Sequence, residues 1–161
     1  MKKTLLVYYS FGGNTKYAAE TLAQYVQGLK TERLTVDREP PHSGLAKFLK
    51  GGKSALMQED PGLHPLREDL SLYERIILAF PVWAGTIPPA ISAFLKEADL
   101  DGKEIFTIVC SASGNAKKSA EIVRNSLPGS VFKNSLSLVN PLKNTEKTEQ
   151  ALAAFSLELK D

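Results

Sequence analysis

The segment LLVYYSFGGNT, which spans residues 5–15, decides the fold. Its first residues form a continuous apolar run, which is typical of a β-strand covered on both faces. A glycine turn follows, and apolar residues then recur at helical spacing at Ala18, Leu22, Val26 and Leu29. A buried strand that leads through a glycine turn into an amphipathic helix predicts the first unit of an α/β fold.

The same alternation of strands and helices continues along the chain. The further strands are expected at residues 31–37, 76–80, 105–110 and 131–139. The buried faces of the further helices are expected at Ile91, Phe94, Leu95 and Ala98, at Ala120, Ile122, Val123 and Leu127, and at Leu152, Phe155 and Leu159. One more helix is required between residues 38 and 72, where the candidate from Leu45 to Met57 is interrupted by two glycines.

Five strands that alternate with helices predict a three-layer, doubly wound parallel sheet of the α/β class. Among the common strand orders for such sheets, five strands fit the order 2-1-3-4-5 best. The strand at residues 131–139 is less apolar than the others, so we expect it at an edge. In this order a ligand binds beyond the carboxyl ends of strands 1 and 3, where the winding reverses. The loops after strands 1, 3 and 4 are therefore the candidates for carrying the chemistry.

The bulk composition restricts the class of function. The 161 residues suit one domain, residues 1–161, which is large enough to bury a proper core. The chain has 20 Lys and Arg against 18 Asp and Glu, a balance too even to argue for nucleic acid or an anionic membrane as a partner. Cys110 is the only cysteine, so no intrachain disulfide can form. His42 and His64 lie far apart in the sequence and lack the spacing of a zinc site.

The sequence gives no signal for export or membrane insertion. Its start, MKKTLLV, has the charge of a signal peptide, but the apolar run is too short and no small-residue cleavage site follows promptly. No apolar run approaches the roughly 18 residues that a membrane span needs. We therefore expect a cytoplasmic protein.

The first of the three loops suits a phosphate group. It consists of Ser10, Phe11, Gly12, Gly13, Asn14 and Thr15. The glycines let the backbone approach a ligand closely, and the amides at the N-terminus of the following helix attract an anion. The spacing matches neither the G-x-G-x-x-G dinucleotide motif nor the Walker loop. A plain strand-to-helix turn with a serine or asparagine cap is the alternative.

The second loop offers an aromatic surface. It consists of Pro81, Val82, Trp83, Ala84 and Gly85. Trp83 is the only tryptophan of the chain, and a large aromatic side chain in a loop is usually covered by something. A flat aromatic ligand stacked on the indole would supply that cover, and the alternative is that Trp83 folds back onto the domain. Gly85 gives the backbone freedom to approach a ring edge and to change its orientation.

The third loop is small and rich in backbone amides. It consists of Ser111, Ala112, Ser113, Gly114 and Asn115. Such a loop suits hydrogen bonds to the edge of a heteroaromatic ring. Taken together, the loops predict a ligand with a phosphate at one end and a flat ring at the other, and FMN is such a ligand.

Two stretches of the sequence resemble the flavodoxin family. Tyr9-Ser10-x-Gly-Gly-Asn14-Thr15 resembles the flavodoxin phosphate loop, and residues 73–89 closely resemble the segment that contacts the flavin in flavodoxin-like proteins. The resemblance implies a flavodoxin-like fold and an FMN cofactor. It implies that the first loop holds the phosphate, that residues 81–85 line the isoalloxazine ring, and that residues 111–115 approach its pyrimidine side.

Two departures from that family bear on redox behaviour. Electron-carrying flavodoxins are typically strongly acidic and place a second aromatic residue in the third loop, whereas this chain carries a net charge of +2 and has no aromatic residue at positions 111–115. Less negative charge around the ring makes the reduced flavin anion easier to form. We therefore expect a less negative potential than in a dedicated carrier, and one face of the flavin open to a substrate.

The function that follows is redox chemistry through FMN. Electrons would pass to a partner protein or to a small acceptor such as a quinone, and the protein would act as a monomer or a homodimer. An NAD(P)H-dependent quinone or flavin reductase and a cofactor-free interaction module of the same fold are the alternatives. Tyr9, His42 and His64 have no arrangement that indicates a catalytic acid, base or nucleophile.

Two other classes of small α/β protein do not fit the sequence. A low-molecular-weight phosphatase needs an arginine six positions after its cysteine, but the position six after Cys110 is Ala116. A receiver domain needs acidic residues at the end of the first strand and after the third. The chain has Tyr9 and Ser10 at the first of these places and Phe80 and Pro81 at the second.

Overall fold

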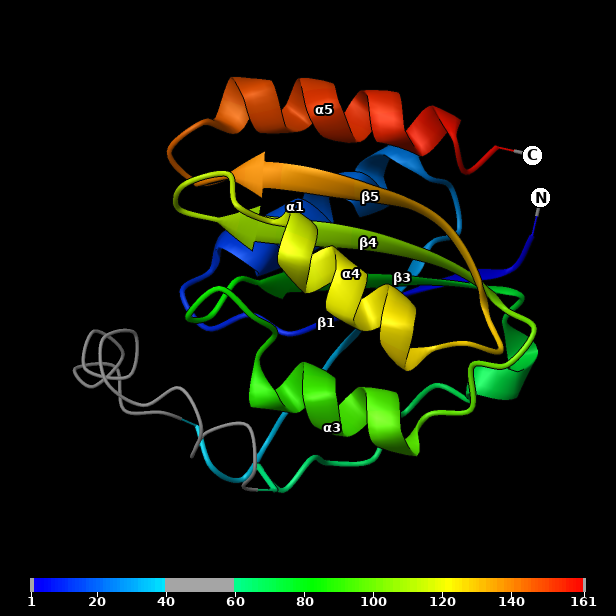
Figure 1. Ribbon diagram of the computed structural model, residues 1–161. Coiled ribbons are helices and arrows are strands. Elements are labelled where there is room, and N and C mark those ends of the chain that lie inside the picture. Colours follow the sequence, from blue (N-terminus) through cyan, green and yellow to red (C-terminus); the bar gives the residue numbers. More distant parts are fainter. Residues whose placement is uncertain (1, 40–59, 161) are drawn as a thin grey trace.

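The computed structural model describes residues 2–39 and 60–160, which form a twisted parallel sheet covered by helices on both faces (Figure 1). Within these residues the sheet has five strands in the order β2-β1-β3-β4-β5. The strands are β1 (Thr4–Tyr8), β2 (Lys30–Arg33), β3 (Arg75–Pro81), β4 (Glu104–Ser111) and β5 (Val131–Val139). The predicted fold class and the predicted strand order are confirmed.

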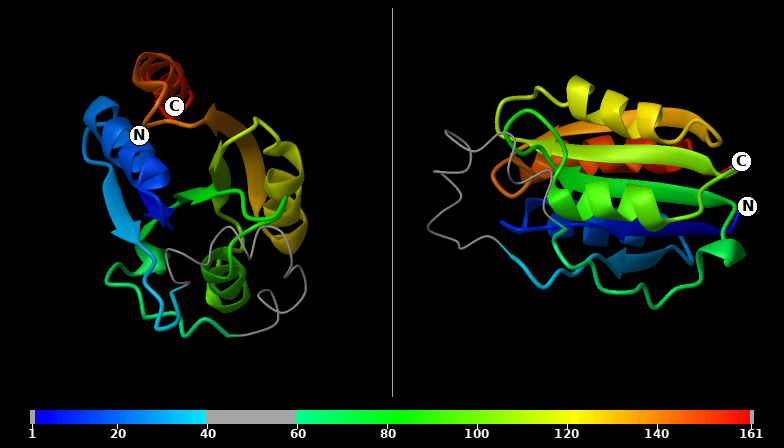
Figure 2. Two further views of the ribbon diagram at one scale, coloured as in Figure 1. Left: turned by 90° about the vertical axis from the view of Figure 1, so that its left-hand side faces the viewer. Right: turned by 60° about the horizontal axis from the view of Figure 1, so that its bottom comes forward.

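The helices divide between the two faces of the sheet. They are α1 (Asn14–Tyr25), α3 (Pro89–Glu97), α4 (Lys117–Ser126) and α5 (Thr145–Leu157), with a short 3-10 helix η1 (Leu70–Leu72) before β3. Helices α1 and α5 cover one face, and α3 and α4 cover the other (Figure 1, Figure 2). The helix candidate from Leu45 to Met57 lies outside the described residues.

Each face of the sheet has its own apolar core, which explains the continuous apolar runs of the central strands. Leu5 and Val7 of β1 point toward α3 and α4, whereas Leu6 and Tyr8 point toward α1 and α5. Leu5, Leu6 and Val7 are completely buried. A fully buried leucine or valine side chain contributes about 1.5–3 kcal/mol, so such a strand can only lie at the centre of the sheet.

The edge strand β2 is shorter than the predicted strand at residues 31–37. It ends at Arg33, although the amide of Leu34 still donates to the carbonyl of Tyr8 at 2.7 Å. Beyond it the chain leaves the sheet, and Val36 pairs with Leu63 in an isolated antiparallel bridge. This part of the prediction was wrong because the sequence pattern carries no sign of the distant segment that takes over the pairing.

The other edge strand is β5, as its low apolar content predicts. Its register against β4 shifts between Ile105 and Phe106, which face Phe132 and Asn134, so Lys133 is the extra residue of a bulge.

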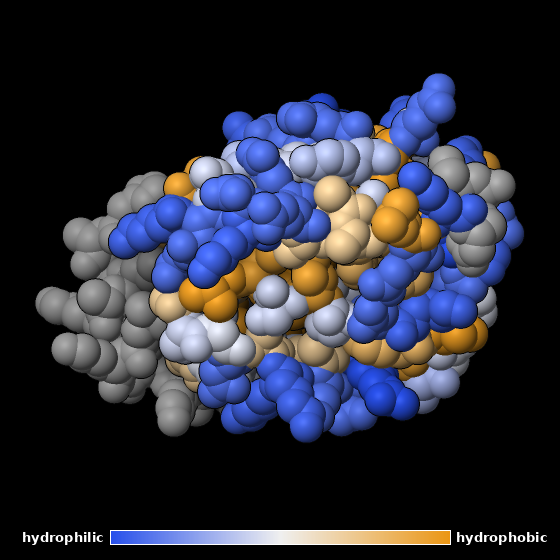
Figure 3. Space-filling model, turned by 90° about the horizontal axis from the view of Figure 1, so that it is seen from above, coloured by the Kyte–Doolittle hydropathy of each residue, from blue (hydrophilic) through white to orange (hydrophobic). Residues whose placement is uncertain are grey.

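Seen from the side that carries α5, the surface is mainly hydrophilic and contains a hollowed strip of more apolar residues (Figure 3).

A buried ion pair closes the amino end of the sheet, opposite the three predicted loops. Arg75 begins β3 and has no exposed surface, and its Nε and Nη2 donate to Glu104 Oε2 at 3.0 and 2.8 Å. Its Nη1 donates to the carbonyl of Leu159 at 2.8 Å, beyond the end of α5. Lys2 Nζ donates to Glu104 Oε1 at 2.5 Å. A buried guanidinium needs such partners, and here they join the start of β3 to β4 and to the chain after α5.

Candidate functional site

A cavity opens at the carboxyl ends of β1, β3 and β4, where the strand order predicts it. It has a volume of about 210 Å³. The lining residues are Ser10, Phe11, Gly12, Asn14, Thr15, Pro81, Val82, Trp83, Cys110, Ser111, Ala112, Asn140 and Pro141. Ligand pockets commonly hold about 300–1,000 Å³, so a ligand of the size of FMN would extend beyond the space that these residues enclose.

The first loop presents the N-terminus of α1 to the cavity. Gly13 immediately precedes the helix with φ 89°, a left-handed conformation that favours glycine. Ser10 Oγ accepts the amide of Lys16 at 3.1 Å, and the amide of Tyr17 donates to the carbonyl of Gly13. The amides of Asn14 and Thr15, which precede these two, have no partner within the helix. They can therefore donate to an anion in the cavity.

The glycines of this loop meet different surroundings. A Cβ atom on Gly12 would meet nothing within 4 Å, which leaves open space beside the backbone. A Cβ atom on Gly13 would lie 3.3 Å from Leu142 Cδ1, and its φ already strains any other residue. The loop thus provides an accessible backbone at Gly12 and a tight turn at Gly13.

Cys110 lies at the base of the cavity and is nearly completely buried. Burial raises the pKa of its thiol to about 12, and a hydrogen bond with the Thr15 side chain offsets only part of that shift. The thiol is therefore neutral near pH 7, and a neutral buried thiol is a poor nucleophile. This agrees with the exclusion of phosphatase chemistry. The sequence pattern predicts Cys110 as the last residue of a strand and gives no sign that it lines the cavity.

The second loop is a tight turn that holds Trp83 at the rim of the cavity. Amide-to-carbonyl hydrogen bonds run both ways between Trp83 and Thr86, at 3.0 and 2.8 Å. Ala84 and Gly85 between them both have positive φ, 47° and 73°, as in a type I′ turn. The buried hydroxyl of Ser119 donates to the carbonyl of Thr86 at 3.1 Å and ties the turn to α4.

The indole of Trp83 is anchored to the domain and still lines the cavity. Its ring lies edge-on to Phe11, with centroids 5.8 Å apart and planes 89° apart, and also packs edge-on to Tyr9. Trp83 remains half-buried. The indole therefore packs against the domain, as the second sequence-based interpretation expects, and it also lines the cavity. That a flat ligand stacks on it stays a prediction.

The third loop is organised by side-chain caps on its own backbone. Ser111 Oγ accepts the amide of Gly114 at 2.8 Å, and Gly114 has φ 83°. Asn140, directly after β5, donates from its amide to the carbonyl of Ser111 and from Nδ2 to the carbonyl of Ala112, at 2.9 and 3.1 Å. The loop is thus held by a hydrogen bond within it, from Gly114 to Ser111, and by two hydrogen bonds from Asn140.

The structure brings most of the predicted residues to one cavity, but not all. The predicted residues that line it are Ser10, Phe11, Gly12, Asn14, Thr15, Pro81, Val82, Trp83, Ser111 and Ala112. The predicted residues that do not line it are Gly13, Ala84, Gly85, Ser113, Gly114 and Asn115. The first three of these form the backbone turns, and the last three follow Ala112, the last residue of this loop that lines the cavity. As ligand contacts, all sixteen remain predictions.

Sequence reasoning missed the contribution of the loop after β5. Asn140 and Pro141 line the cavity, and Asn140 has φ 42°, which asparagine tolerates better than most residues. The amide of Leu142 donates to Asn14 Oδ1 at 3.0 Å and joins this loop to the first one. The signal was available, because an Asn-Pro pair directly after a strand marks a turn at the same edge of the sheet.

Two hydrogen bonds bring charged side chains to the end of β1 beside the cavity. Arg33 Nη2 donates to the carbonyl of Ser10 at 3.1 Å, which places a fixed positive charge beside the first loop. Burial raises the pKa of Tyr9, and the hydrogen bond that its hydroxyl donates to Glu39 Oε2 at 2.8 Å raises it further. Tyr9 therefore stays protonated across the ordinary pH range.

In residues 2–39 and 60–160, no group of His, Cys, Asp and Glu side chains could hold a metal ion. None of the helices in this part of the chain has the length and apolar character needed to cross a membrane.

Comparisons with solved structures identify the same architecture elsewhere. A Bacteroides eggerthii protein provisionally named a flavoprotein has a TM-score of 0.78 at 22% identity, with 96% of each chain covered. A Lactobacillus acidophilus flavoprotein in complex with FMN has a TM-score of 0.70 at 20% identity, covering 91% of this chain and 98% of that one. Oxidised flavodoxin 2 from Bacillus cereus has a TM-score of 0.64 at 19% identity, covering 96% of this chain and 95% of that one. At these sequence identities, the structural similarity establishes the fold.

Sequence comparison adds the family. Among curated proteins, none matches the chain. A family model described as Flavodoxin matches residues 3–155, which is nearly the whole sequence. The cavity at the carboxyl ends of the strands agrees with that match, and this chain belongs to the flavodoxin family.

Proposed function

We propose that the chain binds FMN in this cavity and passes electrons through it. The observation that carries the proposal is the meeting of three separate loops at one edge of the sheet. One loop presents helix amides, one holds an indole and one is rich in backbone amides. A flavin mononucleotide has a phosphate for the first and a planar ring for the other two.

The phosphate end of FMN fits the first loop. The amides of Asn14 and Thr15 and the helix dipole of α1 favour an anion at this place. Ser10 and Thr15 bring hydroxyl groups to the same wall of the cavity. Arg33, bound to the carbonyl of Ser10, adds positive potential without entering the cavity wall.

The ring end fits the space beside Trp83. Val82 and Trp83 would contact the flat face, and Ser111 and Ala112 would approach the polar edge. The Lactobacillus acidophilus relative is a complex with FMN, which supports the same cofactor here. Bound FMN supplies reversible electron transfer, and the protein supplies position and electrostatics.

A reductase that takes hydride from NADH or NADPH and reduces a quinone is the second candidate. What favours it is the third loop, because residues 111–115 contain no aromatic side chain to cover the second face of a flavin. A substrate could then reach that face. A carrier and a reductase differ in one measurement, which is steady oxidation of NADH or NADPH by the FMN-loaded protein with a quinone as acceptor.

The test of the proposal is a titration of the purified apoprotein with FMN and with riboflavin, followed by flavin fluorescence. Saturable binding of FMN, clearly tighter than that of riboflavin, is the expected result because the first loop contributes only when a phosphate is present. Equal affinity for the two flavins would remove the phosphate assignment. The absence of binding to either would leave the cofactor-free interaction module as the better description.

A further inference from the structure

A second hollow lies between α4 and the edge strand β5, on the face of the sheet that α3 and α4 cover. It has a volume of about 560 Å³. Its lining residues, which we call the α4–β5 groove, are Gly114, Ala116, Lys117, Ala120, Glu121, Arg124, Phe132, Lys133, Asn134, Ser135 and Ser137. None of them is needed to explain the FMN cavity except Gly114, which belongs to the third predicted loop.

The groove exists because small residues face each other across it. Ala116, directly before α4, and Ala120 of α4 line one side, and Ser135 and Ser137 of β5 line the other, so the helix and the strand do not close the space between them. The hydroxyl of the buried Thr107 donates to Ser135 Oγ at 2.7 Å, which fixes the base of the groove from β4. The hollow is therefore set by the packing of the sheet and not by a loop.

The walls of the groove are predominantly positive. Lys117, Arg124 and Lys133 line it, against the single carboxylate of Glu121 among the lining residues. The guanidinium of Arg124 lies over the ring of Phe132 at 5.9 Å, which restrains it in place. Lys133 Nζ lies 3.5 Å from Glu104 Oε1, yet its side chain is still 42% exposed.

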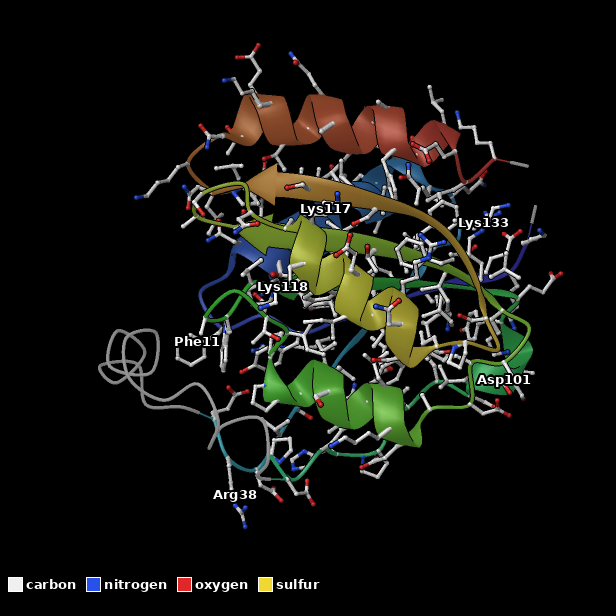
Figure 4. All side chains as sticks on the ribbon, viewed as in Figure 1. Phe11, Arg38, Asp101, Lys117, Lys118 and Lys133 are labelled. Atoms are coloured by element: carbon white, nitrogen blue, oxygen red, sulfur yellow. The ribbon has the colours of Figure 1, made fainter. Side chains whose placement is uncertain are left out.

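The positive charges are spread along the groove and do not converge on one point. Lys117 lies at the end of α4 near the predicted FMN site, and Lys133 lies toward the opposite end of the sheet (Figure 4). The stretch of β5 from residue 132 to residue 137 spans roughly 17 Å at about 3.3 Å per residue. A small anion cannot contact all of these separated positive groups at once, whereas an extended polypeptide with spaced carboxylates can.

The groove also begins where the FMN cavity ends. Gly114 lines the groove, and Ala112, on the same loop, lines the cavity. A polypeptide lying in the groove would therefore reach the side of the site where the third loop is expected to meet the ring. This continuity links the groove to electron exchange.

We propose that the α4–β5 groove docks an acidic segment of a partner redox protein, which delivers one electron at a time to the flavin. In this step the partner is oxidised by one electron and the flavin is reduced by one. The docking follows from the charge and shape of the groove alone. The electron transfer rests on the proposed FMN function.

The docking is tested by titrating the isotope-labelled protein with an oligoglutamate peptide and recording backbone amide NMR shifts. The expected shifts concentrate at residues 114–121 and 132–137 and weaken as salt is added. Lys117→Glu/Arg124→Glu should lower the affinity about tenfold, since two attractive contacts become repulsive. The matched control Lys147→Glu/Lys160→Glu, on the side of the sheet that α5 covers, should leave the affinity unchanged.

Electron delivery is tested separately on the FMN-loaded protein. A reduced, acidic [2Fe–2S] ferredoxin serves as the donor, and flavin reduction is followed by stopped-flow absorbance. The Lys117→Glu/Arg124→Glu variant should be reduced about tenfold more slowly than the parent at low salt, and the difference should shrink at high salt. Lys118→Glu, which changes the same end of α4 but does not line the groove, is the control for a change in flavin potential and should slow the reaction much less. Because the peptide titration needs no FMN, loss of cofactor binding and loss of docking are told apart.

Several results would overturn the docking proposal. One is peptide-induced shifts spread evenly over the surface, and another is equal peptide affinity in the Lys117→Glu/Arg124→Glu variant. A single-stranded oligothymidylate that binds the groove more tightly than the peptide would point to nucleic acid. Sedimentation showing a dimer of the protein that the same variant abolishes would make a second copy of this chain the occupant.

Discussion

Asn14 Oδ1 accepts a hydrogen bond from the backbone amide of Leu142 at 3.0 Å, so the start of α1 is held by the loop after β5. These residues lie 128 positions apart in the sequence. The contact fixes the loop that we assign to the phosphate from the far end of the chain, which makes Asn14 a sharp place to test that assignment.

Asn14→Asp keeps the acceptor for Leu142 but adds a negative charge at the N-terminus of α1. We expect little change in the free energy of unfolding, and an FMN affinity lowered about tenfold, roughly 1.4 kcal/mol, by repulsion of the phosphate. Riboflavin affinity should stay the same because riboflavin has no phosphate. Parallel fluorescence titrations with the two flavins check this, and an equal loss for both would move the phosphate away from Asn14.

Trp83→Ala should weaken FMN binding by roughly 1–3 kcal/mol, since the variant loses the indole that lines the cavity. Trp83→Phe, which keeps an aromatic ring, should recover most of the affinity. Tyr25→Ala, which removes an exposed ring at the end of α1, is the control and should bind as the parent does. Unchanged FMN affinity in Trp83→Ala would remove this side chain from the site.

Ala84→Gly should stabilise the protein slightly, by up to about 1 kcal/mol, because Ala84 has φ 47° where glycine is unstrained. Ala154→Gly in α5 is the matched comparison and should cost about 1 kcal/mol, as glycine does within a helix. Urea unfolding of both variants gives the measurement. A destabilised Ala84→Gly would mean that the turn carries no strain at this residue.

The free energy of unfolding should decrease at acidic pH because Glu104 becomes protonated. Lys2 and then Arg75 hold the pKa of its carboxyl below the ordinary value of 4.5 against the opposing effect of burial. A lowered pKa in the folded state means that the stabilisation is fully present above about pH 4.5 and is lost as the pH falls through the folded value. Urea unfolding across pH 3–6 should show this loss in the parent, and Glu104→Gln should show a flatter profile.

Arg75→Met tests the same buried pair from the other side. Removing the guanidinium leaves the Glu104 carboxylate and the carbonyl of Leu159 without these hydrogen bonds, and we expect a loss of about 3–5 kcal/mol in the free energy of unfolding. The double variant Arg75→Met/Glu104→Gln should lose less than the sum of the single changes. If the losses in the free energy of unfolding simply added, Arg75 and Glu104 would not stabilise the fold through each other.

The midpoint potential of bound FMN should be less negative than that of strongly acidic flavodoxins. The chain has a net charge of +2, so its overall charge does not oppose the reduced flavin anion as that of a strongly acidic flavodoxin does. Lys118→Glu, at the end of α4 nearer the predicted site, should make the potential more negative (Figure 4). Spectroelectrochemical titration gives both values, and a strongly negative couple in the parent protein would contradict the expectation.

The parts of the fold that follow from local patterns could be predicted from the sequence. The apolar runs of β1 and β3 identified strands buried on both faces, and the low apolar content of β5 identified an edge. With the strand order, these patterns placed the candidate loops at one end of the sheet. This worked because parallel sheets bring the carboxyl ends of their strands together.

What could not be predicted depends on partners that are distant in the sequence. Arg75 looks like the exposed start of a strand, and only the positions of Glu104 and Leu159 make its burial possible. The early end of β2 depends on Leu63, which pairs with Val36. In the same way, the packing of Trp83 on Tyr9 and Phe11 is a tertiary contact without a local signal.

The Arg75–Glu104 pair and the cavity lie at opposite ends of the same strands. Strand β4 alone runs from Glu104 to Ser111, which corresponds to about 23 Å at roughly 3.3 Å per residue. Free-energy changes at sites this far apart usually add without interacting. Substitutions that strengthen the amino end of the sheet should therefore compensate for destabilising substitutions introduced at the predicted FMN site, without altering that site.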